Sequence, residues 1–166
     1  MADTTKPFVI SRIFDAPRDR VWKAWTEAEH LKKWWGPKGF VVTHLELDLR
    51  PGGRMHYCLR MPDGNELWGR FVYREIESPA RLVWLNSFSD KDGGLATHPM
   101  NPTWPREMLT TVSFKDLGGK TEVTVVWVPM DGSTDLERST FEAGRDSMKM
   151  GWTGTLEQFA GFLAKI

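Results

Sequence analysis

Hydrophobic residues in the first part of the chain change from a strand-like to a helix-like spacing. Residues 8–14 are rich in β-branched and aromatic side chains, which predicts a first strand. Pro17 suits the first turn of a helix. Apolar residues then follow at helical spacing: Val21, Trp22, Trp25 and Ala28. Thr26 and Glu29 have capping-box spacing, so a second short helix is predicted to begin there and to end at Gly36-Pro37.

From residue 40 onward the hydrophobic spacing changes to two, the period of a β-strand. Strands are predicted over residues 40–49, 54–61, 67–76, 82–88, 108–115 and 121–129. Residues 89–105 differ, because they contain two glycines and three prolines and show no period. A loop this long in a compact domain is often a lid or a binding loop.

The final segment has the pattern of an amphipathic helix. Thr134 and Glu137 have capping-box spacing and predict its start. Its apolar stripe comprises Phe141, Met148, Trp152, Leu156, Phe159, Leu163 and Ile166. The predicted order is strand, helix pair, five or six antiparallel strands and long helix, which is an α+β arrangement. A curved sheet must cover its apolar face, and a straight helix cannot fit it everywhere, so a cavity is expected between them.

Composition and charge narrow the possible functions. Apolar residues make up 40% of the chain, charged residues 27%, and the net charge is zero, which argues against a nucleic-acid surface. Cys58 is the only cysteine, the N-terminal residues lack an apolar signal segment, and no apolar run is long enough to span a bilayer. A cytoplasmic location is therefore expected. Without repeats or linkers, residues 1–166 are predicted to form one domain.

Several motifs, in order along the chain, resemble those of a known family. Residues 24–37 resemble its N-terminal helical signature, and residues 48–53 resemble the turn after its second strand. Arg81-Leu82-Val83 and Gly151-Trp152 also match. The chain is thus similar to the START-like (SRPBCC) superfamily, in the branch named for the activator of the heat-shock protein 90 ATPase, from about residue 7 to residue 164.

This resemblance implies a fold and a range of functions. The fold is the helix-grip (START/Bet v 1-like) fold, a curved antiparallel sheet wrapped around a long C-terminal helix, with two short helices after the first strand and a hydrophobic cavity. Members of the superfamily bind lipids, sterols, polyketides or plant hormones, and some are cyclases or hydrolases. Asn86 stands where an aromatic residue is common, and residues 89–105 form a longer loop than usual. Both differences would alter what a pocket accepts.

The candidate ligand-binding residues are mostly apolar side chains predicted to point inward from the strands and the last helix. They are Trp34, Trp35, Met55, Tyr57, Leu82, Trp84, Asn86, Phe88, Met108, Trp127, Arg145, Met148 and Trp152. Any one of the apolar residues is more often plain core. Trp34 and Trp35 either close a mouth of the cavity or plug the helix end. Tyr57 and Asn86 are polar at inward positions, where a buried group needs a partner or a ligand.

Two candidates carry alternatives of their own. Arg145 either receives a carboxylate or phosphate in the cavity or pairs outward with Glu142 or Asp146. His98, in the long loop, is either an exposed residue or a lid residue that reaches the ligand.

Metal and cofactor chemistry is not expected from the motifs. His56 and Cys58 project from one strand face, but His30 and His44 are not spaced to complete a zinc site. There is no phosphate-binding glycine loop and no defensible Ser–His–Asp arrangement.

The leading prediction is a cytoplasmic protein, monomeric or homodimeric, that binds a small hydrophobic or amphipathic ligand, without nucleic-acid binding or membrane insertion. The alternatives are a cyclase- or hydrolase-type enzyme acting on an aromatic or polyketide-like substrate, and a stress-related, co-chaperone-like interaction module.

Overall fold

The computed structural model describes residues 5–99 and 101–166. The elements before the main run of strands are β1 (Phe8–Phe14), α1 (Arg18–Thr26) and α2 (Ala28–Trp34). The strands that follow are β2 (Val41–Leu47), β3 (Arg54–Arg60), β4 (Glu66–Glu77), β5 (Arg81–Ser89), β6 (Leu95–Ala96), β7 (Met108–Asp116) and β8 (Thr121–Pro129). The last elements are α3 (Asp135–Ala143) and α4 (Arg145–Leu163).

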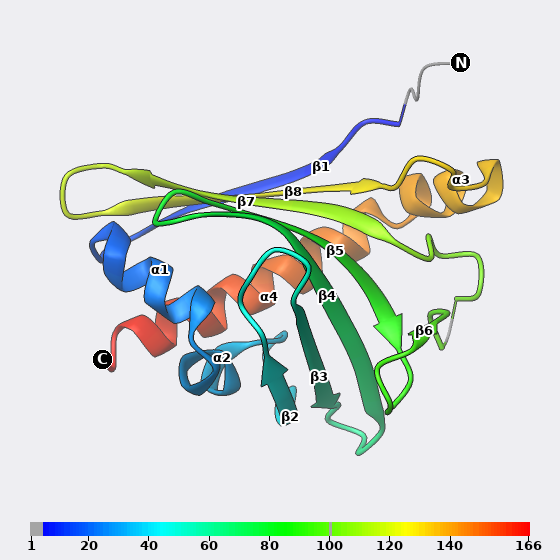
Figure 1. The fold of residues 1–166 in the computed structure, drawn as a ribbon, viewed down its shortest axis with the longest axis horizontal. Coiled ribbons are helices and arrows are strands. Elements are labelled where there is room, and N and C mark those ends of the chain that lie inside the picture. The colour runs from blue at the N-terminus through cyan, green and yellow to red at the C-terminus, as the bar shows by residue number, and fades with distance from the viewer. Residues whose placement is uncertain (1–4, 100) are drawn as a thin grey trace.

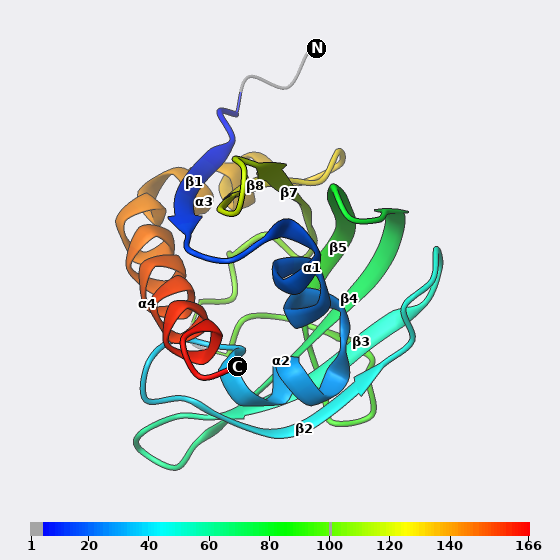
Figure 2. The ribbon, with the colours of Figure 1, turned by 90° about the vertical axis from the view of Figure 1, so that its left-hand side faces the viewer.

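The strands form one antiparallel sheet that bends around α4. Its order is β1-β8-β7-β5-β4-β3-β2, with the two-residue strand β6 paired to β5. Figure 1 shows β2, β3 and β4 turning away from β1, β7 and β8, with α4 behind the sheet. In Figure 2, α1 and α2 lie at one end of the molecule, where α2 contacts β2 and α4, and α1 contacts β7. This arrangement is the predicted helix-grip fold.

The core between the sheet and the helices is strongly aromatic. Trp25 on α1 is buried, and its ring lies 4.8 Å from that of Trp34, 5.7 Å from that of Phe114 and 5.8 Å from that of Phe159. These contacts connect α1 with α2, β7 and α4. Part of the tryptophan content is therefore accounted for by packing, since aromatic side chains bury a large apolar area each.

The first predicted capping box does not form. The Thr26 hydroxyl donates to the backbone oxygen of Trp22 at 2.7 Å, so Thr26 completes the last turn of α1. Helix α2 then begins after Glu27 without a side-chain cap. The second predicted capping box is confirmed, because the Thr134 hydroxyl and the Glu137 carboxylate each accept from the other residue's backbone N–H, at 3.0 and 2.9 Å.

The predicted long C-terminal helix is divided into α3 and α4 at Gly144. A Cβ atom at this position would lie 2.8 Å from Cζ3 of Trp104, closer than real side chains approach. Glycine therefore lets Trp104, from the long loop, pack on the junction of the two helices. The buried stripe of α4 ends at Leu163, because Ile166 lies beyond the helix and is 48% exposed.

Candidate functional site

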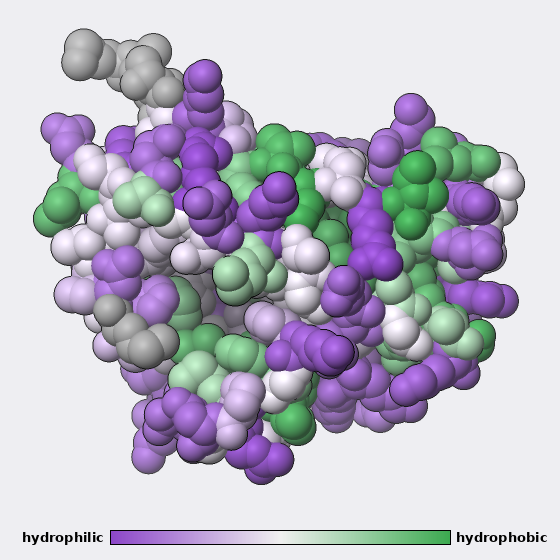
Figure 3. Space-filling model, turned by 180° about the vertical axis from the view of Figure 1, so that it is seen from behind, coloured by the Kyte–Doolittle hydropathy of each residue, from purple (hydrophilic) through white to green (hydrophobic). Residues whose placement is uncertain are grey.

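A cavity of about 480 Å³ lies between the inner face of the sheet and α4. Strands β3, β4, β5, β7 and β8, the loop before β7, and α4 all contribute to its wall. On the face drawn in Figure 3, hydrophobic side chains border a hollow in the surface. This volume falls within the range of about 300–1,000 Å³ that is typical of small-molecule sites.

Nine of the residues predicted from the sequence line this cavity. They are Trp35, Tyr57, Trp84, Asn86, Phe88, Met108, Trp127, Met148 and Trp152. The period of two in the strands and the stripe on α4 bring these side chains to one wall. His98 also lines the cavity, and its ring lies 4.5 Å from that of Phe88. The long loop therefore reaches the cavity, which agrees with the alternative in which His98 is a lid residue.

Three of the predicted residues lie in the core, away from the cavity wall. Trp34 is 1% exposed, and its indole N–H donates to the backbone oxygen of Ala24 at 2.9 Å, so it fills the end of α2. Met55 and Leu82 are fully buried, and the Tyr73 hydroxyl lies 3.9 Å from the Met55 sulfur. The inward direction of Met55 and Leu82 was predicted correctly, but neighbouring side chains separate these two residues from the cavity.

Arg145 also lies away from the cavity wall. Its guanidinium pairs with the Glu142 carboxylate at 2.7 Å and donates to the backbone oxygens of Lys6 and Pro7. This pairing lowers the pKa of the Glu142 carboxyl. Arg145 therefore connects Lys6 and Pro7 to α4. Of the two alternatives for Arg145, the structure contains the one in which it pairs outward with Glu142.

Sequence reasoning missed several cavity residues, among them the tryptophans Trp68 and Trp104. Trp104 lies in the aperiodic loop, where no spacing predicts a side-chain direction. Phe71 on β4 could have been found from the alternation of that strand. In the structure it lies opposite Asn86, another residue of the cavity wall. Ser147 and Thr155 border Met148 and Trp152 on the helix, and α-helical spacing would have indicated both.

Three tryptophans of the wall have an indole N–H without a partner. The Nε1 atoms of Trp84, Trp127 and Trp152 are buried and make no hydrogen bond within the described part of the chain. The rings of Trp127 and Trp152 lie 5.5 Å apart at an angle of 80°. Trp25 also has an unpaired N–H, but it lies in the aromatic core. Each buried donor without a partner costs about 1–3 kcal/mol of stability.

Among the described residues, no Asp, Glu, Lys or Arg lines the cavity. Tyr57 is positioned by Gly69, where a Cβ would lie 2.5 Å from Cζ of Tyr57. Burial raises the pKa of Tyr57 to about 12, against the opposing effect of a hydrogen bond with Trp35. Burial also lowers the pKa of His98 below 6.5. Both groups are therefore uncharged at pH 7, and the cavity wall is neutral.

Comparison with known proteins identifies the family. The family of activator of Hsp90 ATPase homolog 1-like proteins matches residues 15–164. The chain belongs to this family. A search of curated protein sequences found no match. No helix in the described ranges combines the length and the apolar character needed to cross a membrane.

Solved structures with the same fold include proteins from several bacteria. Protein Ms6760 from Mycobacterium smegmatis is 26% identical, with a TM-score of 0.76 over 96% of this chain and 91% of that chain. Protein NE0264 from Nitrosomonas europaea is 24% identical, with a TM-score of 0.75 over 99% and 97% of the two chains. The AHSA1 protein from Silicibacter pomeroyi is 16% identical, with a TM-score of 0.74 over 96% and 98%. The last two similarities bear on the fold alone.

Proposed function

We propose that this member of the Hsp90-ATPase-activator-like family is a cytoplasmic protein that binds one small, uncharged, amphipathic ligand in the cavity between the sheet and α4. The ligand is apolar over most of its surface and carries oxygen atoms that accept hydrogen bonds. The cavity of about 480 Å³, whose wall is mostly aromatic and aliphatic with a few uncharged polar groups, carries this proposal. Tyr57, Asn86 and Ser147 are polar residues of the wall that would orient such a ligand by hydrogen bonds.

The rest of the wall supports the same ligand class. Met108 and Met148 have flexible thioether side chains, which adapt to ligands of different shape. The neutral wall offers no partner for an ionised group, and burying an unpaired charge is costly. A free fatty acid or a phosphate ester would therefore bind more weakly than a neutral alcohol, ester or ketone of the same size.

The wall gives less support to the enzyme alternative. Acid–base catalysis needs titratable groups that converge on the reacting atoms with pKa values near the working pH. The high pKa of Tyr57 makes its hydroxyl a hydrogen-bond donor and a very weak acid. Among the described wall residues, that leaves His98 without a carboxylate partner in the cavity.

The glycines of α4 supply a direct test of ligand binding. Gly151 lines the cavity, and a Cβ built on it would meet no atom within 4 Å, so the Gly151→Leu side chain would occupy the ligand's space. Gly161 lies on the same helix, is exposed and also has open space, so Gly161→Leu is the matched control. Nile red is a suitable probe because it is uncharged, largely apolar and carries a carbonyl acceptor.

The expected result is saturable one-to-one binding of Nile red by the wild-type protein and by Gly161→Leu. Binding to Gly151→Leu should fall at least tenfold, with circular dichroism showing that both variants are folded. Equal binding by Gly151→Leu and the wild type would overturn the proposal, as would the absence of saturable binding to the wild type.

A further inference from the structure

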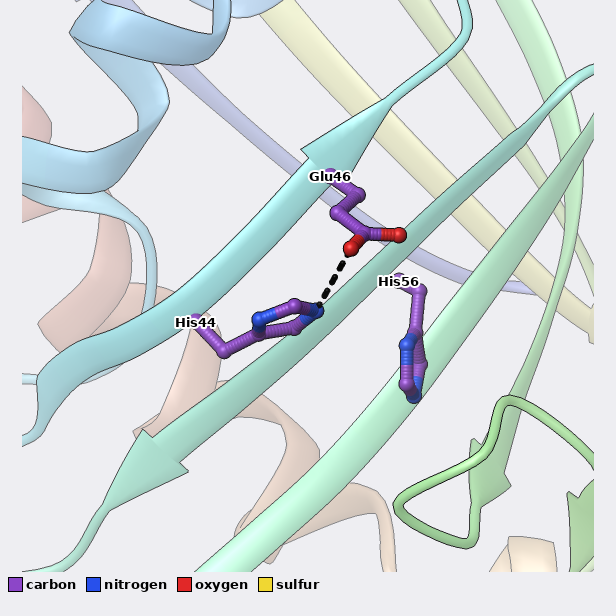
Figure 4. A group of neighbouring side chains, drawn as sticks. All are labelled: His44, Glu46 and His56. Carbon is purple, nitrogen blue, oxygen red and sulfur yellow. Dashed lines mark ion pairs between the residues drawn. The ribbon is translucent and has the colours of Figure 1, made fainter.

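Three side chains with metal-ligand chemistry lie together on the outer face of the sheet, on the opposite side from the cavity. His44 and Glu46 are two residues apart on β2, and the register pairs Glu46 with His56 on β3. The potential ligand atoms of these three residues all lie within 4.8 Å of one another. Figure 4 shows the three side chains on neighbouring strands, with the His44 and Glu46 side chains in contact.

A bulge in β2 creates this cluster. The register with β3 shifts between Val42, which pairs with Leu59, and His44, which pairs with Cys58. Val42 packs against the core, so regular alternation would direct His44 inward as well. The extra residue at the shift instead places His44 on the outer face, and Leu45 becomes the buried residue. The sequence spacing of the histidines did not reveal this juxtaposition.

His56 is held in a state that is ready to bind a metal. It is 4% exposed, and its ring stacks on that of Trp68 at 5.1 Å. Its Nε2 lies 3.1 Å from the backbone oxygen of Asp90, and because a carbonyl oxygen only accepts, Nε2 is the donor. In the neutral ring Nδ1 then keeps its lone pair. Metal-binding histidines usually donate their other N–H to a carbonyl or carboxylate in this manner.

The other two ligands have the freedom to close around an ion. The side chain of His44 is 35% exposed and that of Glu46 is 69% exposed, with His44 Nε2 and Glu46 Oε1 3.6 Å apart. Ligand atoms of a tetrahedral zinc site lie about 3.3 Å apart, given bonds of about 2.0–2.1 Å. Small side-chain rotations of the two exposed residues are therefore enough to reach that geometry around the fixed His56.

We propose that His44, Glu46 and His56 bind a late first-row divalent cation of the zinc class. Two imidazoles and one carboxylate form a known donor set for such ions, and it leaves coordination positions open. A depression of about 290 Å³, lined in part by Glu46, Gly53 and His56, adjoins the cluster and gives water access to those positions.

The charged and thiol groups nearby have other partners. The guanidinium groups of Arg54 and Arg70 both donate to the backbone oxygen of Gly93. The thiol of Cys58, on the same face, donates to Glu66 at 3.1 Å. The proposed ligand set is therefore the two histidines and the glutamate alone.

Titration with Co²⁺ followed by displacement with Zn²⁺ tests this site. The expected result is one equivalent of bound Co²⁺ with visible d–d absorption, which Zn²⁺ removes. His44→Ala changes a partly exposed side chain and Glu46→Gln an exposed one, so the fold should be kept, and each should weaken Co²⁺ binding at least tenfold. The controls are His30→Ala and His98→Ala, which change the two histidines outside the cluster and should leave binding unchanged.

Two outcomes would contradict a metal site formed by His44, Glu46 and His56. The absence of saturable Co²⁺ or Zn²⁺ binding in chelator-free buffer would overturn the proposal. Binding that His44→Ala and Glu46→Gln leave intact would also overturn it, because the metal would then be held elsewhere. Neither outcome bears on the ligand cavity, which the Nile red experiment tests separately.

Discussion

Tryptophan residues in this protein differ in what their N–H groups contact. The N–H of Trp34 donates to Ala24, whereas those of Trp127 and Trp152 are buried at the cavity wall without a partner in the described residues. Phenylalanine at any of these positions would remove the N–H and a similar volume. The contribution of the Trp34 hydrogen bond to stability is therefore separable by experiment from the effect of the smaller ring.

We expect Trp34→Phe to lose a hydrogen bond that Trp127→Phe does not lose, and one such bond contributes about 0.5–1.5 kcal/mol. Trp34→Phe should therefore lower the free energy of unfolding by about 1 kcal/mol more than Trp127→Phe does, since only Trp34 loses a bond within the protein. Urea unfolding of both variants checks this, and an equal loss of unfolding free energy in the two variants would contradict it.

His98 predicts a pH dependence of stability. Because burial lowers its pKa in the folded state below 6.5, the unfolded chain takes up the proton first as the pH falls. The contribution of His98 to stability is therefore complete above pH 6.5 and is lost as the pH falls below it. His98→Asn should show a smaller loss of unfolding free energy between pH 7 and pH 5. An identical pH profile for the two proteins would rule out this effect.

The two tyrosines predict the opposite behaviour at alkaline pH. Burial raises the pKa values of Tyr57 and Tyr73 above 10.0 in the folded state. The unfolded chain therefore loses these protons first, and stability falls as the pH rises above 10. Spectrophotometric titration should show almost no tyrosinate at pH 10 until the protein unfolds. Half-ionisation of either tyrosine at pH 10 in the folded protein would be inconsistent with this burial.

At the level of elements, hydrogen bonds and the packing of Trp104 connect the long loop to α3 and to the junction of α3 and α4. The Thr103 and Thr140 hydroxyls lie 2.8 Å apart, the backbone N–H of Arg106 donates to Glu137 at 2.8 Å, and Trp104 packs on Gly144. The loop thus has a defined position over one end of the cavity, and Gly144 is the residue that allows it.

We expect Gly144→Ala to destabilise the protein by about 1–3 kcal/mol, because the added methyl group displaces the Trp104 ring. Gly161→Ala, in open space on α4, should stabilise it by up to about 1 kcal/mol, since alanine is the better helix former. Thermal unfolding of both variants measures the difference. If Gly144→Ala were as stable as Gly161→Ala, the position of the loop would not depend on the contact between Trp104 and Gly144.

The same elements show what a sequence can and cannot predict. Local periods predicted the strands and the inward direction of Tyr57, Met108 and Trp152, because side-chain direction in a regular element follows from spacing. The break at Gly144 was not predicted, and neither was the Trp104 ring of a distant loop that packs on it. The proximity of His44 and Glu46 to His56 was not predicted either, because it depends on the register between β2 and β3. Contacts between distant segments decided each of these cases.

On the scale of the whole molecule, the curved sheet has two chemically different faces. The inner face and α4 enclose a neutral, aromatic cavity, while the outer face of β2 and β3 carries the cluster of His44, Glu46 and His56. The proposed ligand and the proposed metal occupy opposite faces of the sheet, so each can be removed by substitution without touching the other's contacts.

Native mass spectrometry tests the central proposal most directly. Wild-type protein and Gly151→Leu would be incubated with an equimolar mixture of a neutral long-chain ketone and the matching fatty acid, and the bound mass would be read for each. We expect the wild type to carry one molecule per chain, mainly the ketone, and Gly151→Leu to carry none. A wild-type protein that stays empty, or a variant that binds as much as the wild type, would contradict a ligand site between the sheet and α4.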